Sequence, residues 1–172
     1  VKYIYNQLKK YESEVDQNDS TYWLYFELIW RDFFKYVSMQ HKEKFFSRDG
    51  IYGDEKQWST DQKTLSNWIN GKTSEPFVNA NMIELFETGF MSNRGRQNVS
   101  NYLTKELKID WRIGAEYFES MLIDYDVHSN YGNWLYNAGI GNDSMPFRKF
   151  NPKLQSERYD PDKLYEKTWL ND

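Results

Sequence analysis

The sequence contains no cysteine, which excludes disulfides, thiolate nucleophiles and sulfur-ligated zinc or iron–sulfur clusters. Long apolar runs are also missing: no stretch approaches the roughly 20 residues needed to span a bilayer, and none has the layout of a signal peptide. We therefore expect a soluble, cytoplasmic (intracellular) protein with no membrane partner. Because the chain begins at Val1 rather than Met, we also expect it to be a fragment of a longer chain.

An excess of positive charge is absent too, since the formal net charge is −4 and the isoelectric point is near 5.3. Unselective binding to DNA requires clustered lysine and arginine to neutralise phosphates. Any contact with nucleic acid must therefore be local. The chain of 172 residues lies within the usual size of one domain, so we expect a single domain over residues 1–172 and a monomer.

Aromatic side chains are abundant instead: 7 Trp, 14 Tyr and 11 Phe make up 19% of the residues. Such side chains bury a large area in a core, and they also serve as stacking platforms for flavins or nucleic-acid bases. Composition favours the core but leaves both uses open.

Apolar residues recur at helical spacing along most of the chain, and the alternation typical of strands does not persist. The sequence therefore predicts an all-α fold. Ser20 or Thr21 is expected to cap a helix over residues 22–37, which is apolar nearly all round and is expected to be buried with charges inside it. Pro76 and Gly89 are expected to begin and end another helix. Further helices are expected within residues 1–11, 59–71, 99–107 and 115–122.

Three other segments have irregular patterns. Residues 41–58 mix charges, glycines and aromatic pairs and are expected to form an excursion that ends at Trp58. Residues 93–95 are expected to form a turn. Beyond Met145 the chain is polar, and we expect it to wrap the surface.

Glu27 and Arg31 lie four residues apart on one predicted helix, with Trp30 beside both. A plain intrahelical salt bridge would explain this pair. In an otherwise apolar helix, however, a desolvated charge needs a partner or a ligand. The segment alone leaves both interpretations open.

Residues 92–98 gather two arginines and three amide side chains around Gly95. This composition suits the polar edges of a ligand, and it suits a solvated helix start equally well.

Asp124 and Asp126 are followed shortly by the amide of Asn130, a pattern that fits a metal site, an acid–base pair or the end of a helix. The graded ligand spacing of a calcium loop is missing, and the two histidines, His41 and His128, are far apart in sequence. We therefore expect no metal. A serine–histidine–aspartate site lacks a nucleophile elbow.

Five segments together resemble the signature of the photolyase–cryptochrome family. They read Glu-Leu-Ile-Trp-Arg-Asp at 27–32, Pro-Phe-Val-Asn-Ala-Asn-Met at 76–82, Thr-Gly-Phe-Met-Ser-Asn-Arg-Gly-Arg-Gln-Asn at 88–98, Ile-Asp-Trp-Arg at 109–112, and Asp-Tyr-Asp followed by Asn-Tyr-Gly-Asn-Trp within 124–134. Gln97 and Tyr136 resemble the DASH branch of the family. The resemblance implies the helical bundle of the family's FAD-binding (catalytic) domain, without the amino-terminal domain that binds an antenna chromophore.

For the cofactor, the resemblance implies a bent FAD with Asn130 facing the flavin N5, Arg96 paired with Asp124 beside the ring, and Asp126 near its pyrimidine edge. A guanidinium and an amide at the ring would favour the reduced flavin. The full set of cofactor-binding residues implied is Arg31, Asn93, Arg96, Asp124, Asp126 and Asn130.

For the reaction, the resemblance implies a deoxyribodipyrimidine photo-lyase, a carbon–carbon lyase that repairs cyclobutane pyrimidine dimers by electron transfer from light-excited reduced FAD. Single-stranded DNA is the expected partner, because extruding a base costs least there. The catalytic residues implied are Glu27 and Asn93 as partners of the damaged bases, Trp30 as an aromatic wall, and Gln97 and Tyr136 as lining.

Trp58, Trp111 and Trp134 would pass as core residues on spacing alone. The resemblance implies that Trp134, Trp111 and Trp58 are the inner, middle and outer members of an electron-transfer chain that reduces the flavin.

Two alternatives remain open. The same pocket could serve a cryptochrome photoreceptor or a nucleic-acid-binding flavoprotein that does not repair DNA. The chain could also fold without a cofactor, because the segment that wraps the flavin phosphates in this family is absent here, and its charge-assisted hydrogen bonds with it.

Overall fold

The computed structural model describes residues 1–170, and within them every regular element is a helix, so the all-α prediction is confirmed. The only strand-like pairing in that range is an isolated bridge between Ser59 and Ile109. The elements are α1 (Lys2–Glu14), α2 (Asp19–His41), the 3-10 helix η1 (Lys42–Phe46), α3 (Gln62–Ile69), α4 (Pro76–Thr88), α5 (Asn93–Asn101), the π-helix η2 (Tyr102–Glu106), α6 (Trp111–Met121), α7 (Val127–Ala138), α8 (Pro152–Tyr159) and α9 (Leu164–Leu170).

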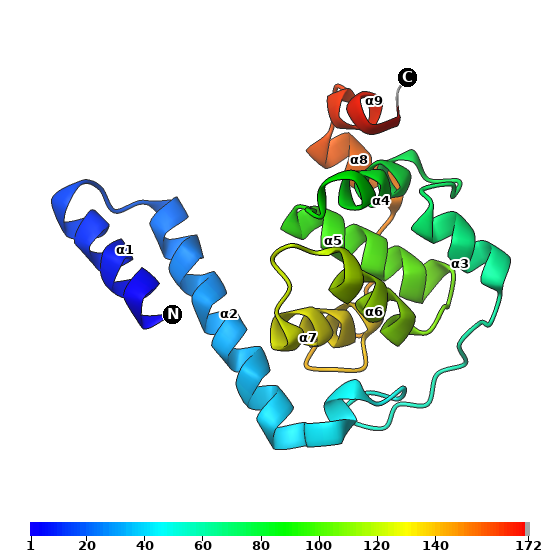
Figure 1. Ribbon diagram of the computed structural model, residues 1–172, viewed down its shortest axis with the longest axis horizontal. Coiled ribbons are helices and arrows are strands. Elements are labelled where there is room, and N and C mark those ends of the chain that lie inside the picture. The colour runs from blue at the N-terminus through cyan, green and yellow to red at the C-terminus, as the bar shows by residue number, and fades with distance from the viewer. Residues whose placement is uncertain (171–172) are drawn as a thin grey trace.

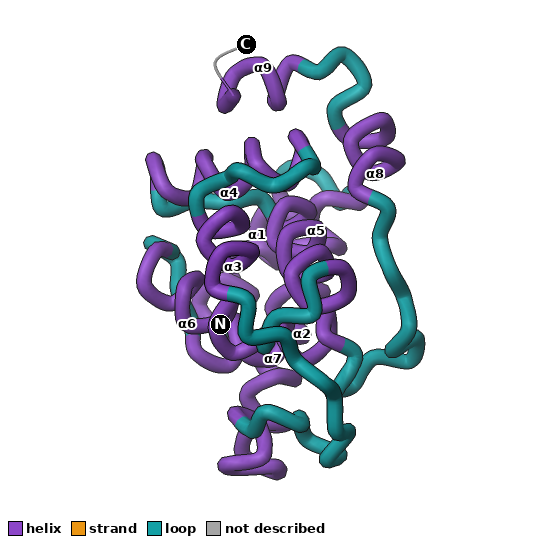
Figure 2. Tube along the Cα trace, turned by 90° about the vertical axis from the view of Figure 1, so that its right-hand side faces the viewer, coloured by secondary structure: helices purple, strands orange, loops and turns teal. Residues whose placement is uncertain are grey.

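Helices α1 and α2 form a hairpin that stands beside a body built from the later helices (Figure 1). The carboxyl-terminal half of α2 joins the two parts, because its buried Phe34 packs against Gly132 of α7. Helices α8 and α9 lie at one end of the body near α4, as both views show (Figure 2). No helix within residues 1–170 is long and apolar enough to cross a membrane.

The core lies within the body, where α3, α4, η2, α6 and α7 meet. Indoles form much of it: Trp68 and Trp111 are fully buried, and Trp134 is 2% exposed. Such large side chains each remove a great deal of apolar area from water, which stabilises the packing of short helices. Aliphatic core residues around them include Val78, Met82, Leu85, Met91, Val99, Leu103, Leu135 and Ile140.

The start and stop signals of α4 act as predicted. Pro76 occupies the first helical turn, where its missing N–H costs nothing, and Gly89 ends the helix in the left-handed conformation with φ of 69°. The predicted cap of α2, Ser20 or Thr21, was wrong by two or three residues. Its cap is Asn18, whose side chain accepts the N–H of Thr21 while the Thr21 hydroxyl accepts the N–H of Asn18.

The expectation that residues 22–37 are buried is also wrong. In α2, Tyr22, Trp23 and Tyr36 are each more than half exposed, and only Thr21, Phe34, Val37 and Ser38 are buried. The helix packs on α7, η1 and α1, and within the described chain these neighbours cover only part of its circumference. An apolar pattern all round a helix does not say which face has a partner.

Residues 93–95 do not form a turn, because α5 begins at Asn93 and Ser92 caps it by accepting the N–H of Gly95. The tail beyond Met145, for which only a path over the surface was predicted, contains α8 and α9. Tyr165 of α9 packs against Phe77 and donates a hydrogen bond of 2.6 Å to Glu84, so the tail docks on α4. The excursion over residues 41–58 is confirmed as irregular after η1.

Candidate functional site

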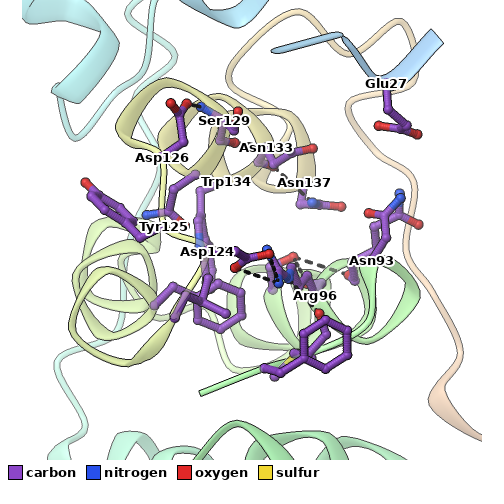
Figure 3. Close-up of a pocket in the computed structure, with 17 residues that line it drawn as sticks. Glu27, Asn93, Arg96, Asp124, Tyr125, Asp126, Ser129, Asn133, Trp134 and Asn137 are labelled. Atoms are coloured by element: carbon purple, nitrogen blue, oxygen red, sulfur yellow. Dashed lines mark hydrogen bonds and ion pairs between the residues drawn. The ribbon is translucent and has the colours of Figure 1, made fainter. Parts of the chain in front are cut away.

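A cavity of about 370 Å³ opens between α5, α7 and the loop that joins α6 to α7 (Figure 3). Polar side chains line its sides, and the Trp134 indole and the Phe118 ring lie at its apolar part. Its volume is near the lower end of the roughly 300–1,000 Å³ that is usual for ligand sites. The predicted site residues on its wall are Glu27, Asn93, Arg96, Gln97, Asp124, Asp126, Asn130 and Trp134.

Arg96 and Asp124 form a forked ion pair on this wall. The Arg96 Nη2 lies 3.0 Å and 2.9 Å from the two carboxylate oxygens of Asp124, and its Nε donates to the Met91 carbonyl at 2.8 Å. The guanidinium is therefore held from two sides, as the dashed lines in Figure 3 show. A guanidinium fixed in this way has a defined orientation toward whatever occupies the cavity.

Asn130 is 9% exposed and lies on the same cavity as Arg96 and Asp124. Its Nδ2 donates to the carbonyl of Ala115 at 2.9 Å, which orients the amide. The Oδ1 accepts no hydrogen bond from residues 1–170, so it is available as an acceptor toward a ligand.

Asp126 caps α7 and also binds α2. Its carboxylate accepts the N–H of Ser129 at 2.9 Å and pairs with Arg31 at 3.2 Å. Burial raises the pKa of Asp126, but the Ser129 hydrogen bonds and the nearby Arg31 charge outweigh burial and hold that pKa below its ordinary value. The intrahelical pair of Glu27 with Arg31 does not form within the described residues, because Arg31 turns to Asp126 instead.

A second cavity of about 220 Å³ adjoins the first, and the two share five lining residues, which are Glu27, Asn93, Gln97, Ser129 and Asn133. Trp30 and Tyr136 form its aromatic sides, with their ring centroids 6.3 Å apart and nearly perpendicular. In Figure 3 the carboxylate of Glu27 on α2 points toward Asn93 on α5. The structure therefore places all five predicted catalytic residues around one hollow, and Arg31 lies there too.

The three predicted electron-transfer tryptophans are spread along the body rather than stacked. Trp134 lies on the first cavity, Trp111 is fully buried and donates to the Arg48 carbonyl at 3.1 Å, and Trp58 lies on a different cavity. Within the described residues, no ring pair joins any two of them.

Sequence reasoning missed one further buried indole beside the first cavity. Trp68 is fully buried, its ring centroid is 6.3 Å from that of Trp134, and its Nε1 donates to the Val99 carbonyl. Its helical spacing with Leu65 and Ile69 is that of an ordinary core residue, so the sequence carried no signal for this contact.

A basic groove of about 350 Å³ was missed as well. Arg94 and Arg158 lie over the ring of Tyr159, at 4.7 Å and 5.4 Å from its centroid, and Arg148 lines the same groove. The groove meets the second cavity at Gln97 and Tyr136. Its arginines come from α5, α8 and the loop between α7 and α8, so only the fold brings them together.

These side chains fit one part of a flavin nucleotide better than another. A flat ring with polar edges matches the first cavity, which offers a guanidinium, carboxylates and an oriented amide over an apolar part. The cavity offers fewer partners to the diphosphate of FAD, because Arg96 is the only cation among the described residues that line it. The arrangement defines a helical domain with a hollow for a flat, polar-edged ring.

The comparison with known families gives this class its name. A family model described as the FAD binding domain of DNA photolyase matches residues 23–172. The chain belongs to the photolyase–cryptochrome family and corresponds to its FAD-binding domain.

Individual relatives support the same assignment. Cryptochrome DASH of Synechocystis sp. is 55% identical over 169 residues, which cover 98% of this chain and 35% of that protein. A solved structure of a Synechocystis cryptochrome matches with a TM-score of 0.95 at 55% identity, again over 98% of this chain and 35% of the other. A class III photolyase from Agrobacterium tumefaciens matches with a TM-score of 0.86 at 35% identity, over 93% of this chain and 33% of the other. The chain therefore spans about a third of the length of these relatives.

Proposed function

We propose that this chain supplies the flavin ring site and the lesion site of a light-driven DNA-repair lyase that acts on cyclobutane pyrimidine dimers. One observation carries the proposal: a polar cavity suited to a flavin ring adjoins an aromatic cavity suited to extruded bases, and Glu27, Asn93 and Gln97 line both. A ring in the first cavity and a base in the second would lie within a few side-chain lengths of each other. Short-range electron transfer requires that proximity.

At the first cavity, the Arg96–Asp124 pair would hold the polar edge of the isoalloxazine ring, and Asp126 would lie near it. The free Oδ1 of Asn130 would accept a hydrogen bond from a protonated ring nitrogen, which would favour the reduced ring. When bound, FAD supplies the light absorption and the one-electron chemistry.

At the second cavity, Trp30 and Tyr136 would stack on an extruded dimer, while Glu27 and Asn93 would hydrogen-bond its base edges. Flipping two bases out of a duplex costs several kcal/mol of stacking and pairing, and the cost is least in a single strand. We therefore infer single-stranded DNA as the preferred substrate.

The basic groove would hold the DNA backbone that leads to the lesion. Three arginines and the Tyr159 ring on this groove offer phosphate contacts and a stacking surface together, which is the usual combination for single-stranded nucleic acid. This local cluster reconciles DNA binding with the net charge of −4.

The test has two steps. The purified chain is first titrated with FAD and its absorption spectrum recorded; bound flavin with a structured blue band is expected. The loaded protein is then reduced, illuminated with blue light and assayed for repair of a dimer in a single-stranded oligonucleotide. Flavin and DNA binding without repair would instead support a photoreceptor.

A second candidate, a folded chain that holds no cofactor, is favoured by one observation. Arg96 alone among the described lining residues is positively charged, so the first cavity offers little to a diphosphate. A chain that unfolds cooperatively but remains colourless in excess FAD would support this candidate. Titration with riboflavin, which lacks the diphosphate, separates loss of the ring site from loss of phosphate contacts.

A further inference from the structure

The loop that joins α7 to α8, over residues 139–151, carries Arg148 to the basic groove. The tip of this loop buries little apolar surface, because Met145 is 55% exposed and Phe147 is 93% exposed. Apolar burial, which fixes most surface segments in place, is therefore weak here. Polar contacts hold the loop instead, and side chains from one short stretch of the chain supply them.

Asn101 binds the loop backbone on both sides of Lys149, and it is only 3% exposed. Its Nδ2 donates to the Arg148 carbonyl at 3.1 Å, and its Oδ1 accepts the N–H of Phe150 at 2.9 Å. One side-chain amide thus pairs with an acceptor and a donor of the loop, as the backbone of a neighbouring strand would. Moving the loop would leave this buried amide without partners, which costs free energy.

Two further side chains hold the same loop. The Lys105 ammonium donates to the Pro146 carbonyl at 2.5 Å and also to the end of α7. The Glu106 carboxylate pairs with Lys149 at 2.6 Å. A partly exposed ion pair of this kind adds little to stability, whereas the hydrogen bonds of the Lys105 ammonium are charge-assisted. Asn101 and Lys105 are therefore the main anchors of the loop.

The π-helix η2 brings these three side chains to one face. The Leu107 N–H donates to the Tyr102 carbonyl, five residues back, at 3.1 Å. A π turn closes between residues i and i+5, whereas an α turn closes between i and i+4, so the wider turn brings residue i+5 as well as i+4 toward the face of residue i. Lys105 and Glu106 thereby share the face of Asn101. Single π turns are rare and often occur at functional sites.

We propose that Asn101 and Lys105 are positioning residues that hold the loop so that Arg148 is ready to bind a phosphate of single-stranded DNA in the basic groove. The inference rests on the proposed function, because it concerns the DNA backbone that leads to the second cavity. Arg148 is exposed, so its side chain loses conformational freedom when it binds. A loop that is already fixed in the free protein avoids the further cost of ordering its backbone.

The salt dependence of DNA binding separates positioning from direct contact. Arg148→Gln should weaken binding of a dye-labelled single-stranded oligonucleotide about fivefold at roughly 0.1 M salt, and it should reduce the slope of log affinity against log salt by about 0.7, because one phosphate contact is lost. Asn101→Ala should weaken binding about threefold and leave the slope unchanged, because only the order of the loop is lost. Asn142→Ala, at an exposed asparagine of the same loop outside the groove, should bind like the wild type.

A double variant tests whether Asn101 acts through Arg148. In the Arg148→Gln background, Asn101→Ala should cause no further loss of affinity, because the arginine that it positions is gone. Additive losses, a reduced slope in Asn101→Ala, or wild-type affinity in Asn101→Ala would each overturn the proposal. If circular dichroism shows that Asn101→Ala is unfolded, Lys105→Gln replaces it. Lys105→Gln should show a similar loss that Lys105→Arg restores, and wild-type affinity in Lys105→Gln would overturn the proposal as well.

Hydrogen exchange measures the hold on the loop without DNA. The Phe150 N–H, followed by NMR, should exchange about tenfold or more faster in Asn101→Ala than in the wild type, and an unchanged rate would overturn the proposal. A wild-type chain that binds no oligonucleotide would overturn the proposed function together with this inference. Wild-type binding that Asn101→Ala leaves unaltered would overturn this inference alone.

Discussion

Single residues at the first cavity are held by charge pairs that the fold creates between distant segments. Arg96 on α5 reaches Asp124 on the loop before α7, and Arg31 on α2 reaches Asp126. Both pairs are partly exposed, so they contribute little to stability, typically about 0–1 kcal/mol each. Their main effect is to orient the groups that face the cavity.

Arg96→Gln tests this orienting effect at the first cavity. It should lower flavin affinity about tenfold or more, because hydrogen bonds to a charged group are typically worth about 1.5–3 kcal/mol, whereas the urea midpoint should hardly change. Flavin fluorescence and absorption titrations measure the affinity. Arg158→Gln, which removes a guanidinium from the basic groove, should bind flavin like the wild type, and wild-type affinity in Arg96→Gln would contradict the assignment.

Lys105 shows a different effect on a single side chain, the lowering of its pKa by burial. Its ammonium donates to the carbonyls of Ala138 and Pro146, and Lys56 shares the Ala138 carbonyl. Burial lowers the pKa of Lys105 to about 8, the Lys56 charge adds to this, and Asp143 opposes it. Between pH 8 and the ordinary value of 10.5 the folded chain therefore binds fewer protons than the unfolded chain, so this group's contribution to stability rises with pH across that window.

The unfolding free energy of the wild type minus that of Lys105→Met should therefore increase as the pH rises through this window. The increase should be about 1 kcal/mol, because the group is half exposed and solvent screens its charge. Urea unfolding at several pH values measures it. Lys149→Met, which removes a lysine paired with Glu106, should show no such increase, and a flat difference for Lys105→Met would contradict the argument.

Much of the site was predictable at this scale, because the motif segments carry the side chains that line the first two cavities. What the sequence could not supply were the partners. The spacing of Glu27 and Arg31 left a bridge between them and a ligand site equally open, whereas the fold offers Arg31 the carboxylate of Asp126, which caps α7. Contacts between segments about a hundred residues apart depend on tertiary packing, which local spacing does not encode.

Among the elements, α2 and α7 make the contact that closes the second cavity. A Cβ added to Gly132 would lie 2.3 Å from Cδ1 of the buried Phe34 ring, so the two helices approach as closely as glycine allows. Phe34 also lines the second cavity. The spacing of these helices therefore sets the shape of the second cavity.

Gly132→Ala should destabilise the chain. Alanine gains about 1 kcal/mol of helix propensity, but overpacking a buried ring typically costs about 1–3 kcal/mol and here requires the helices to separate. The net loss should be up to about 2 kcal/mol in urea unfolding. Asn133→Ala, at the exposed neighbouring position of α7, should be neutral or slightly stabilising. A Gly132→Ala variant that is more stable than the wild type would show that α2 moves away from α7 at little energetic cost.

Elements with strong end signals were predicted well, as α4 shows between Pro76 and Gly89. Elements in polar segments were missed, because α8 and α9 present little apolar periodicity, although they pack on α4 through contacts such as the Tyr165–Glu84 hydrogen bond. Helix α2 shows the opposite failure. Its aromatic surface predicts burial, yet within the described chain most of that surface lacks a covering neighbour.

Over the whole molecule, charge has to be judged by position rather than by sum. A net charge of −4 disfavours unselective binding of nucleic acid, whereas the basic groove concentrates three arginines beside the second cavity. Each phosphate contact to single-stranded DNA contributes about −0.7 to the slope of log affinity against log salt. If the proposed function is right, three contacts predict a slope of about −2.

Arg158→Gln should then weaken binding of a dye-labelled single-stranded oligonucleotide and reduce the size of that slope by about 0.7, because one phosphate contact is lost. Fluorescence anisotropy between about 50 and 200 mM salt gives both quantities. Lys153→Gln lies on the same helix and outside the groove, so it should leave the slope unchanged. Arg158→Gln and Lys153→Gln change the net charge equally and differ only in the position of the lost charge. Equal slopes for the wild type and Arg158→Gln would therefore show that the DNA backbone does not bind in the basic groove.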